Sequence, residues 1–216
     1  MAETTKVKIC GLRTEAALTA ALGGGADYVG LVFFPPSPRH LAPEAAVPLA
    51  AKARGRARIV ALMVDPDDAL IEAVVAAVGP DLLQLHGEES PERVAEVRRR
   101  WARPVMKAVK VETAQDAQGA LAYRGIADLI LFDARAPRDS PLPGGNGLPF
   151  DWQALAEVKD KLAYMLSGGL TPDNVSEAIR VTGARIVDVS SGVEARPGEK
   201  DPALIRRFLL AAKAAN

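Results

Sequence analysis

Eight short apolar runs, each followed by a helical pattern, divide the chain. Runs such as YVGLVFF and IVALMV are nearly continuous in apolar character, which is typical of parallel strands covered on both faces. The spacing predicts eight strand–helix units. The predicted strands begin near Val7, Tyr28, Ile59, Leu82, Val105, Leu129, Tyr164 and Ile186.

Capping side chains and prolines mark the starts of several predicted helices. These signals stand at Thr14, Pro66, Ser90–Pro91 and Thr171–Pro172. Asp65, directly before Pro66, is expected to cap a helix rather than to act as a catalyst.

Eight such units in 216 residues match a closed (β/α)8 barrel, the TIM barrel, better than an open doubly wound α/β sheet, which usually needs fewer units. No linker or low-complexity tract interrupts the pattern. We therefore expect one domain over residues 1–216, with its chemistry at the carboxyl ends of the strands.

Composition narrows the class of protein. Lys and Arg together number 27, as do Asp and Glu, so no global field favours nucleic acid as a partner. A single cysteine excludes an internal disulfide, and MAETTK has no secretion signal, so a cytoplasmic location is expected. Every apolar run is shorter than the ~20 residues that span a bilayer, which argues against a membrane protein.

Cys10, the only cysteine, ends the first predicted strand. A lone cysteine in an apolar strand is usually a small buried hydrophobe. However, Gly11 follows it, a helix start lies near Thr14, and Lys8 stands two positions earlier on the same strand face, at roughly 7 Å. A cation and a helix N-terminus favour thiolate, so we expect a lowered thiol pKa and a role as base or nucleophile.

Asp133 ends the apolar run DLILF. A carboxylate at the end of a buried strand is unfavourable unless it is paired with another group or takes part in catalysis. The alternative to a catalytic role is that Asp133 caps a helix or loop. In an apolar mouth its pKa is expected to rise, which suits a general acid.

Two glycine-containing loops follow the seventh and eighth predicted strands, where barrels of this class often bind phosphate. They are SGGLTPDN, residues 167–174, and DVSSGVE, residues 188–194. Glycines let main-chain N–H groups approach an anion. The alternative is that both are only tight turns.

Three further strand-end or loop residues are candidates for substrate binding. Arg39, in the proline-rich loop PPSPRHL, suits bidentate binding of a carboxylate, although most loop arginines are solvated. His86 shares a strand face with Gln84 and could be a binding or a structural residue. Asp188 lies inside an apolar strand and needs either a ligand amine or a core lysine.

The segment PLPGGNGLPFDW, residues 141–152, lacks the features of a nucleotide-binding loop and is expected to form a mobile lid. No metal-ligand motif is present, so we expect chemistry without a metal.

The order of these motifs resembles that of the phosphoribosylanthranilate isomerase family of tryptophan biosynthesis. The resemblance runs through KVKICGLRT, ADYVGLVFFPPSPRHL, LLQLHGEE, LFDA, GGNGLPFDW, LSGGLTPDNV and VDVSSGVEARPGEKD, from end to end of the chain. It implies a (β/α)8 barrel without a cofactor. The implied reaction is an Amadori rearrangement of N-(5-phosphoribosyl)anthranilate to 1-(2-carboxyphenylamino)-1-deoxyribulose 5-phosphate.

The resemblance also implies roles for the candidate residues. Cys10 would be the general base and Asp133 the general acid. The substrate's carboxylate end would lie at Arg39, with His86 and Asp188 beside it. The phosphate would be bound by Gly168, Gly169, Ser191 and Gly192.

Three alternatives remain beside this interpretation. Another phosphosugar barrel, such as indole-glycerol-phosphate synthase or a dual-substrate sugar isomerase, would carry a rim lysine or carboxylates where Cys10 stands. A non-catalytic phosphosugar-binding subunit would bind without turnover. A redox-sensing thiol would lack a resolving cysteine in this chain. The expected partner is a small phosphorylated molecule, and the protein is expected to be a monomer or a homodimer.

Overall fold

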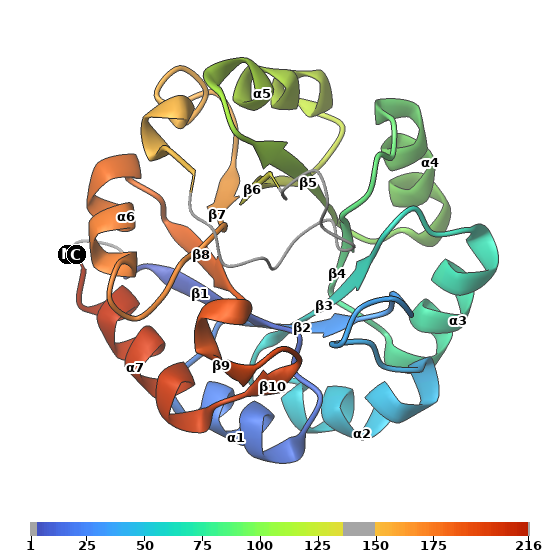
Figure 1. The fold of residues 1–216 in the computed structure, drawn as a ribbon. Helices are drawn as coiled ribbons and strands as arrows, with labels where there is room; N and C mark the ends of the chain where they lie inside the picture. Colours follow the sequence, from blue (N-terminus) through green and yellow to red (C-terminus); the bar gives the residue numbers. More distant parts are fainter. Residues whose placement is uncertain (1–3, 136–149, 216) are drawn as a thin grey trace.

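The computed structural model describes residues 4–135 and 150–215, and these residues form a closed barrel of eight parallel strands (Figure 1). The strands follow one another around the barrel in chain order, so the predicted (β/α)8 barrel is confirmed and the open sheet is wrong. The strands are β1 (Lys6–Cys10), β2 (Tyr28–Val32), β3 (Arg58–Met63), β4 (Leu82–Leu85), β5 (Val105–Val111), β6 (Leu129–Ala134), β7 (Tyr164–Leu166) and β8 (Ile186–Val189).

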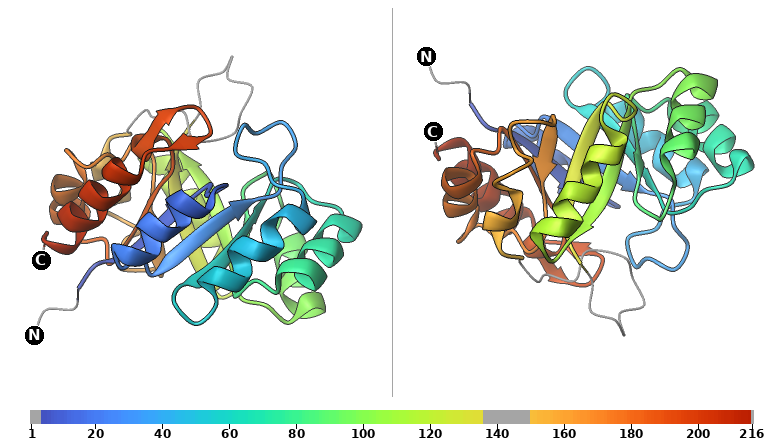
Figure 2. Two further views of the ribbon diagram at one scale, coloured as in Figure 1. Left: turned by 90° about the horizontal axis from the view of Figure 1, so that it is seen from below. Right: turned by 90° about the horizontal axis from the view of Figure 1, so that it is seen from above.

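Helices cover the outside of the strands, as Figure 2 shows in two side views. The α-helices are α1 (Glu15–Gly23), α2 (Pro43–Ala53), α3 (Asp68–Val78), α4 (Pro91–Trp101), α5 (Ala114–Gly119), α6 (Val175–Thr182) and α7 (Pro202–Lys213). Short 3-10 helices are η1 (Ala120–Tyr123), η2 (Trp152–Leu155) and η3 (Ser191–Val193), and β9 (Glu194–Arg196) pairs with β10 (Glu199–Lys200) in a hairpin before α7.

Alternate residues along each strand face opposite sides, which divides the apolar residues into two layers. Outward residues such as Ile9 and Phe132 belong to the large core between strands and helices. Inward residues form a separate apolar cluster, made of Tyr28, Val60, Leu82, Met106, Ala108, Leu131 and Met165. This cluster lies in the interior of the barrel. The buried polar side chains of Lys8, Gln84, Asp133 and Asp188 share that interior.

The predicted helix starts are partly confirmed. The side chains of Thr14 and Ser90 accept hydrogen bonds from the first turns of α1 and α4. The prediction for Asp65 is wrong, because Asp67, directly before α3, accepts the capping bond from Leu70 instead. Asp65 has a left-handed φ of 44° and accepts a hydrogen bond from the main chain of Glu88, so it joins two loops at the rim.

The start predicted at Thr171 is also wrong. The helix α6 begins three residues beyond Pro172, at Val175. The side chain of Asn174 accepts a hydrogen bond from the Thr171 N–H at 2.8 Å, and this contact closes a turn before the helix. The SGGL loop therefore leads into a turn rather than directly into a helix.

The connection from β6 to β7 differs from the expected α-helix. In the described part of this connection the chain forms η2, held by i→i+3 hydrogen bonds such as Ala156 N–H to Gln153 O. Hydrogen bonds between residues i and i+3 are typical of short 3-10 helices that connect other elements. The lid predicted over residues 141–152 lies almost wholly outside the described residues.

The β9–β10 hairpin has no counterpart in the predicted pattern. It stands at the same end of the barrel as the loop between β2 and α2 (Figure 2). A β-carbon at Gly198, which has a φ of 81°, would lie 2.5 Å from the carbonyl oxygen of Pro38. Only glycine permits this close contact, which joins the hairpin to the loop that carries Arg39.

Candidate active site

Cys10 is the last residue of β1, and its side chain lies inside the barrel. It packs against Val32 and Leu62 from the next two strands. Burial raises the pKa of the Cys10 thiol above its ordinary value, while the ammonium group of Lys8 acts in the opposite direction. The predicted position of the thiol at the carboxyl end is confirmed, but its environment is more apolar than expected.

A fully buried ion pair lies next to the thiol on the same strand. The Nζ atom of Lys8 is 2.9 Å from Oδ1 of Asp188, its register partner on β8. Ser167 donates a hydrogen bond to the other oxygen of Asp188 at 3.4 Å. Of the two partners considered for Asp188, a ligand amine or a core lysine, the structure therefore supplies the lysine.

This pairing explains why the pKa of the Cys10 thiol is raised. Asp188 neutralises Lys8 and itself raises the pKa of Cys10, so the loss of hydration on burial prevails over the attraction of the lysine. The expectation of a lowered thiol pKa is therefore wrong. Lys8 is near the sulfur, as the strand spacing predicts, but its charge is shared with a carboxylate.

Asp133 and His86 meet inside the barrel although their strands, β6 and β4, are not neighbours. Nε2 of His86 is 3.3 Å from Oδ2 of Asp133, and both side chains are less than 10% exposed. Nδ1 of His86 is 3.0 Å from Nε2 of Gln84. The other oxygen of Asp133 accepts a hydrogen bond from the main chain of Ala134. The structure thus groups the predicted acid with a buried histidine and an amide.

The described contacts do not join Cys10 directly to Asp133. In the barrel order β7 and β8 separate their strands, and each side chain has its own set of polar neighbours. Both residues nevertheless lie near the carboxyl ends of their strands, at positions that face the barrel interior. The arrangement therefore places a thiol and a carboxyl group on two sides of one barrel mouth.

Arg39 is buried rather than solvated. Its Nε and one Nη atom each donate to a different oxygen of Glu194, both at 2.8 Å, in a bidentate ion pair. The same carboxylate accepts a hydrogen bond from Nζ of Lys200 at 2.6 Å. Two cations hold the pKa of Glu194 at about 2 against the effect of burial, while burial lowers the pKa of Lys200.

Lys200 connects this cluster to the loop after β8. Its ammonium group also donates to the carbonyl and the hydroxyl oxygens of Ser190, and the Ser190 hydroxyl donates to the carbonyl oxygen of Cys10 at 3.3 Å. A chain of buried polar contacts therefore runs from Arg39 through Glu194 and Lys200 to the end of β1.

The two glycine-containing loops pack directly against each other. A β-carbon at Gly192 would lie 1.9 Å from the carbonyl oxygen of Leu170 in the other loop. Gly168 and Gly169 have φ values of 88° and 63°, in the left-handed region. The two loops are therefore neighbours, and their contact requires glycine at position 192.

Main-chain donors gather where these loops meet. Among the hydrogen bonds that the described residues make outside helices and strands, none is donated by the main-chain N–H groups of Gly168, Gly169, Ser191 or Gly192. Unsatisfied main-chain donors that lie together form a suitable site for an anion.

Sequence reasoning missed several residues of this region. Gln84 stands out in the sequence only because it shares a strand face with His86, and no motif marks Ser167, Glu194 or Lys200 as site residues. Glu194 and Lys200 flank the turn of the β9–β10 hairpin in VEARPGEK. Two opposite charges on either side of a Pro-Gly turn were the available signal for the hairpin, but nothing in the sequence links them to Arg39.

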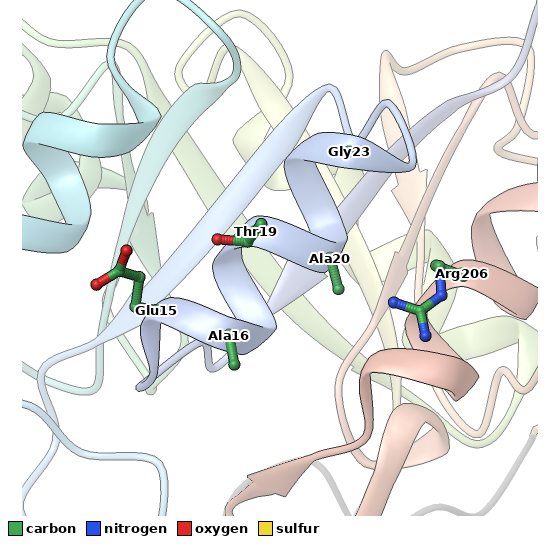
Figure 3. A pocket seen from close by; sticks show the side chains of 6 residues that line it. All are labelled: Glu15, Ala16, Thr19, Ala20, Gly23 and Arg206. Carbon is green, nitrogen blue, oxygen red and sulfur yellow. The ribbon is translucent and has the colours of Figure 1, made fainter.

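Two cavities are lined by none of the candidate residues. One of about 570 Å³ lies on the outer surface between α1 and α7, with the charged side chains of Glu15 and Arg206 near small residues (Figure 3). A second, of about 550 Å³, lies at the ends of β4, β5 and β6 and includes Lys107, Lys110 and Arg135. Neither is lined by a predicted site residue.

Among residues 4–135 and 150–215, no three His, Cys, Asp or Glu side chains are arranged to hold a metal ion. None of the helices described here has the length and apolar character needed to cross a membrane.

Solved structures with this fold include two close matches. A phosphoribosyl anthranilate isomerase in complex with reduced 1-(o-carboxyphenylamino)-1-deoxyribulose 5-phosphate is 36% identical, with a TM-score of 0.85 over 97% of this chain and 98% of the other. The phosphoribosyl anthranilate isomerase of Thermotoga maritima is 37% identical, with a TM-score of 0.88 over the same shares.

Sequence relatives cover nearly the whole chain. N-(5'-phosphoribosyl)anthranilate isomerase of Rhodopseudomonas palustris is 57% identical over 208 residues, 96% of this chain and 95% of the relative. The enzyme of the same name from Brucella canis is 53% identical over 210 residues, 97% and 95% of the two chains. The sequence model of N-(5'-phosphoribosyl)anthranilate isomerase matches residues 7–211. The chain therefore belongs to the N-(5'-phosphoribosyl)anthranilate isomerase family of isomerases.

Proposed function

We propose that the protein converts N-(5-phosphoribosyl)anthranilate to 1-(2-carboxyphenylamino)-1-deoxyribulose 5-phosphate, with Cys10 as general base and Asp133 as general acid. The observation that carries this assignment is the placing of the buried thiol and the buried carboxyl group at the carboxyl ends of β1 and β6. A loop pair rich in main-chain donors lies at the same rim. Membership in the isomerase family supplies the reaction.

Asp133 begins the reaction by donating a proton to the ring oxygen of the ribose. The carbon–oxygen bond at C1 then breaks, and the anilino nitrogen supplies the electron pair that forms a protonated Schiff base. Asp133 becomes a carboxylate, and His86, 3.3 Å away, is placed to stabilise the new charge. Burial of both side chains keeps water from competing for the proton.

Cys10 then removes the proton from C2 of the open-chain sugar. The electron pair of the broken C–H bond moves toward the Schiff base and gives an enolamine, which tautomerises to the ketone. Cys10 acts in this step as a thiolate, so its S–H proton must first leave to solvent. Lys8 stabilises the thiolate, whereas burial favours the neutral thiol. Formation of the thiolate is therefore opposed by the loss of hydration on burial.

The substrate's two anionic ends have separate binding groups. Arg39, oriented by Glu194, would hold the anthranilate carboxylate, with His86 and Asp188 lining the same end of the substrate. The phosphate would accept hydrogen bonds from the main chain at the meeting point of the loops after β7 and β8, from Gly168, Gly169, Ser191 and Gly192.

An assay of the purified protein tests this function directly. Freshly prepared N-(5-phosphoribosyl)anthranilate is mixed with the protein, and the loss of its anthranilate-type fluorescence is followed against buffer alone. Acceleration that requires protein supports the proposal. A rate equal to that in buffer would rule it out, and binding of substrate without turnover would identify a non-catalytic phosphosugar-binding protein instead.

A further inference from the structure

Gln84 and His86 face the barrel interior from the end of β4, two residues apart. Gln84 is completely buried, and its Nε2 atom is 3.0 Å from Nδ1 of His86. An amide nitrogen carries hydrogens and can only donate, so Nδ1 must be the acceptor in this contact. A neutral imidazole whose Nδ1 accepts carries its proton on Nε2.

The protonated nitrogen faces the proposed acid. Nε2 of His86 is 3.3 Å from Oδ2 of Asp133, but the two groups are not aligned as a hydrogen bond, so within the described residues Nε2 has no aligned acceptor. A buried donor without an acceptor is unfavourable. The nearest way to satisfy it is a small rotation toward the Asp133 carboxylate, and the attraction is strongest when that carboxylate is ionised.

We propose that Gln84 is a positioning residue that holds His86 in the tautomer protonated on Nε2, so that His86 supports Asp133 and does not take its proton. This inference rests on the proposed role of Asp133 as the general acid. Gln84 itself touches neither the carboxyl group of Asp133 nor the reacting atoms in this account, and it acts only through the imidazole.

The other tautomer would oppose the reaction. With the proton on Nδ1, Nε2 would present a lone pair to Asp133 and could accept the very proton that the ribose ring oxygen requires. The proton of Asp133 therefore passes to the sugar, and the Nε2–H bond then stabilises the carboxylate that remains.

A rotated amide is the specific alternative. If Gln84 presented Oε1 to the ring, it would accept from Nδ1–H and would select the opposite tautomer. In the described structure Oε1 of Gln84 is buried and makes no hydrogen bond. The two amide orientations therefore differ in which ring nitrogen of His86 carries the proton. Direct observation of the ring nitrogens distinguishes them.

Nuclear magnetic resonance is well suited to this chain because it contains only two histidines, His40 and His86. Long-range proton–nitrogen correlation spectra of uniformly labelled full-length protein show which ring nitrogen carries hydrogen, and a His40→Gln variant assigns the signals. We expect a pyridine-type Nδ1 and a pyrrole-type Nε2 for His86. A pyrrole-type Nδ1 in the wild-type protein would refute the proposal.

Two substitutions connect the tautomer to turnover. Gln84→Glu keeps the shape but offers only acceptors to the ring, so Nδ1 should become protonated and kcat should fall about 10- to 100-fold with a much smaller change in KM. Gln84→Met removes the amide donor without adding an acceptor, so a mixture of tautomers and a smaller fall in kcat are expected. An unchanged tautomer in both folded variants would overturn the proposal.

Ser167→Ala serves as the matched control. It removes a buried hydrogen bond on the opposite side of the interior, to Asp188, and should leave the His86 ring signals unchanged. A shift of the tautomer in this control would reveal a general loosening of the barrel and count against a specific role for Gln84. The spectra are recorded without substrate, so an inactive wild-type protein with the expected tautomer would refute only the proposed function.

Discussion

The sulfur atom of Cys10 lies in the space that a side chain at position 30 would need. Gly30 is the register partner of Cys10 on β2, and a β-carbon built there would be 2.8 Å from Sγ and 3.0 Å from the Cα atom of Cys10. Real β-carbons do not approach other atoms so closely. The position of the proposed base therefore depends on the absence of a side chain on the neighbouring strand.

Gly30→Ala should displace the sulfur and lower catalytic efficiency more than it lowers stability. A misplacement on the order of 1 Å reduces turnover about 10²-fold in well-organised sites. We expect kcat/KM in the isomerase assay to fall by about that factor in a variant that still unfolds cooperatively. Gly23→Ala is the control, because a β-carbon there meets nothing within 4 Å. Equal activity of the two variants would contradict the dependence on Gly30.

The fold is largely predictable because each strand combines a short length with continuous apolar character. Every one of the eight barrel strands begins within one residue of its predicted start. The sixth connection escapes prediction because helical periodicity does not distinguish an α-helix from successive 3-10 turns, and the β9–β10 hairpin escapes it because two- and three-residue strands carry no periodicity. The extent of a single domain over residues 1–216 stays a prediction.

The candidate site is predictable only in part. Polar residues at the ends of apolar strands, such as Cys10 and Asp133, stand out in the sequence because burial is unfavourable for them. The residues that hold them do not stand out, because their contacts join distant positions. Arg39 and Glu194, for example, are 155 residues apart. The expected lowering of the thiol pKa is wrong because the sequence does not show that Asp188 lies opposite Lys8.

Substitution of the proposed acid and base should separate chemistry from binding. Cys10→Ser and Asp133→Asn are each expected to lower kcat by about 10² to 10⁴, because general acid and general base catalysis contribute factors of this size. Steady-state kinetics measure the loss, and calorimetric titration with product checks that binding is largely kept. Either variant with the turnover of the wild type would remove the role assigned to that residue.

The two members of the ion pair beside the thiol should have opposite effects on the pKa of Cys10. Lys8→Met removes the cation that lowers the pKa of Cys10, so that pKa should rise further, whereas Asp188→Asn removes a carboxylate that raises it, so that pKa should fall. The rate of alkylation as a function of pH reports the thiol directly, because the chain has a single cysteine. Shifts in the same direction would show that packing, rather than charge, controls the thiol.

Glu194 should contribute a pH-dependent part of the stability. Its pKa in the folded protein is about 2, below the ordinary value of 4.5, because hydrogen bonds and ion pairs with Arg39 and Lys200 outweigh the effect of burial. A lowered folded-state pKa stabilises the protein above pH 4.5, and this contribution is lost as the pH falls toward 2. At pH 7, Glu194→Gln should therefore lower the free energy of unfolding by about 3 kcal/mol, because it removes the carboxylate charge that two buried cations share.

Comparing the free energies of unfolding of wild type and Glu194→Gln at several pH values separates the contribution of Glu194 from those of the other carboxylates. Urea unfolding at pH 7, 5, 4 and 3 should give a difference that is constant above pH 5 and shrinks at lower pH. Glu15→Gln provides the control, since Glu15 pairs with Lys52 on the surface, where solvent screens the interaction and little stability is at stake. A difference for Glu194→Gln that stayed constant down to pH 3 would mean that the side chain acts through packing, and its charge would then have no part in holding Arg39.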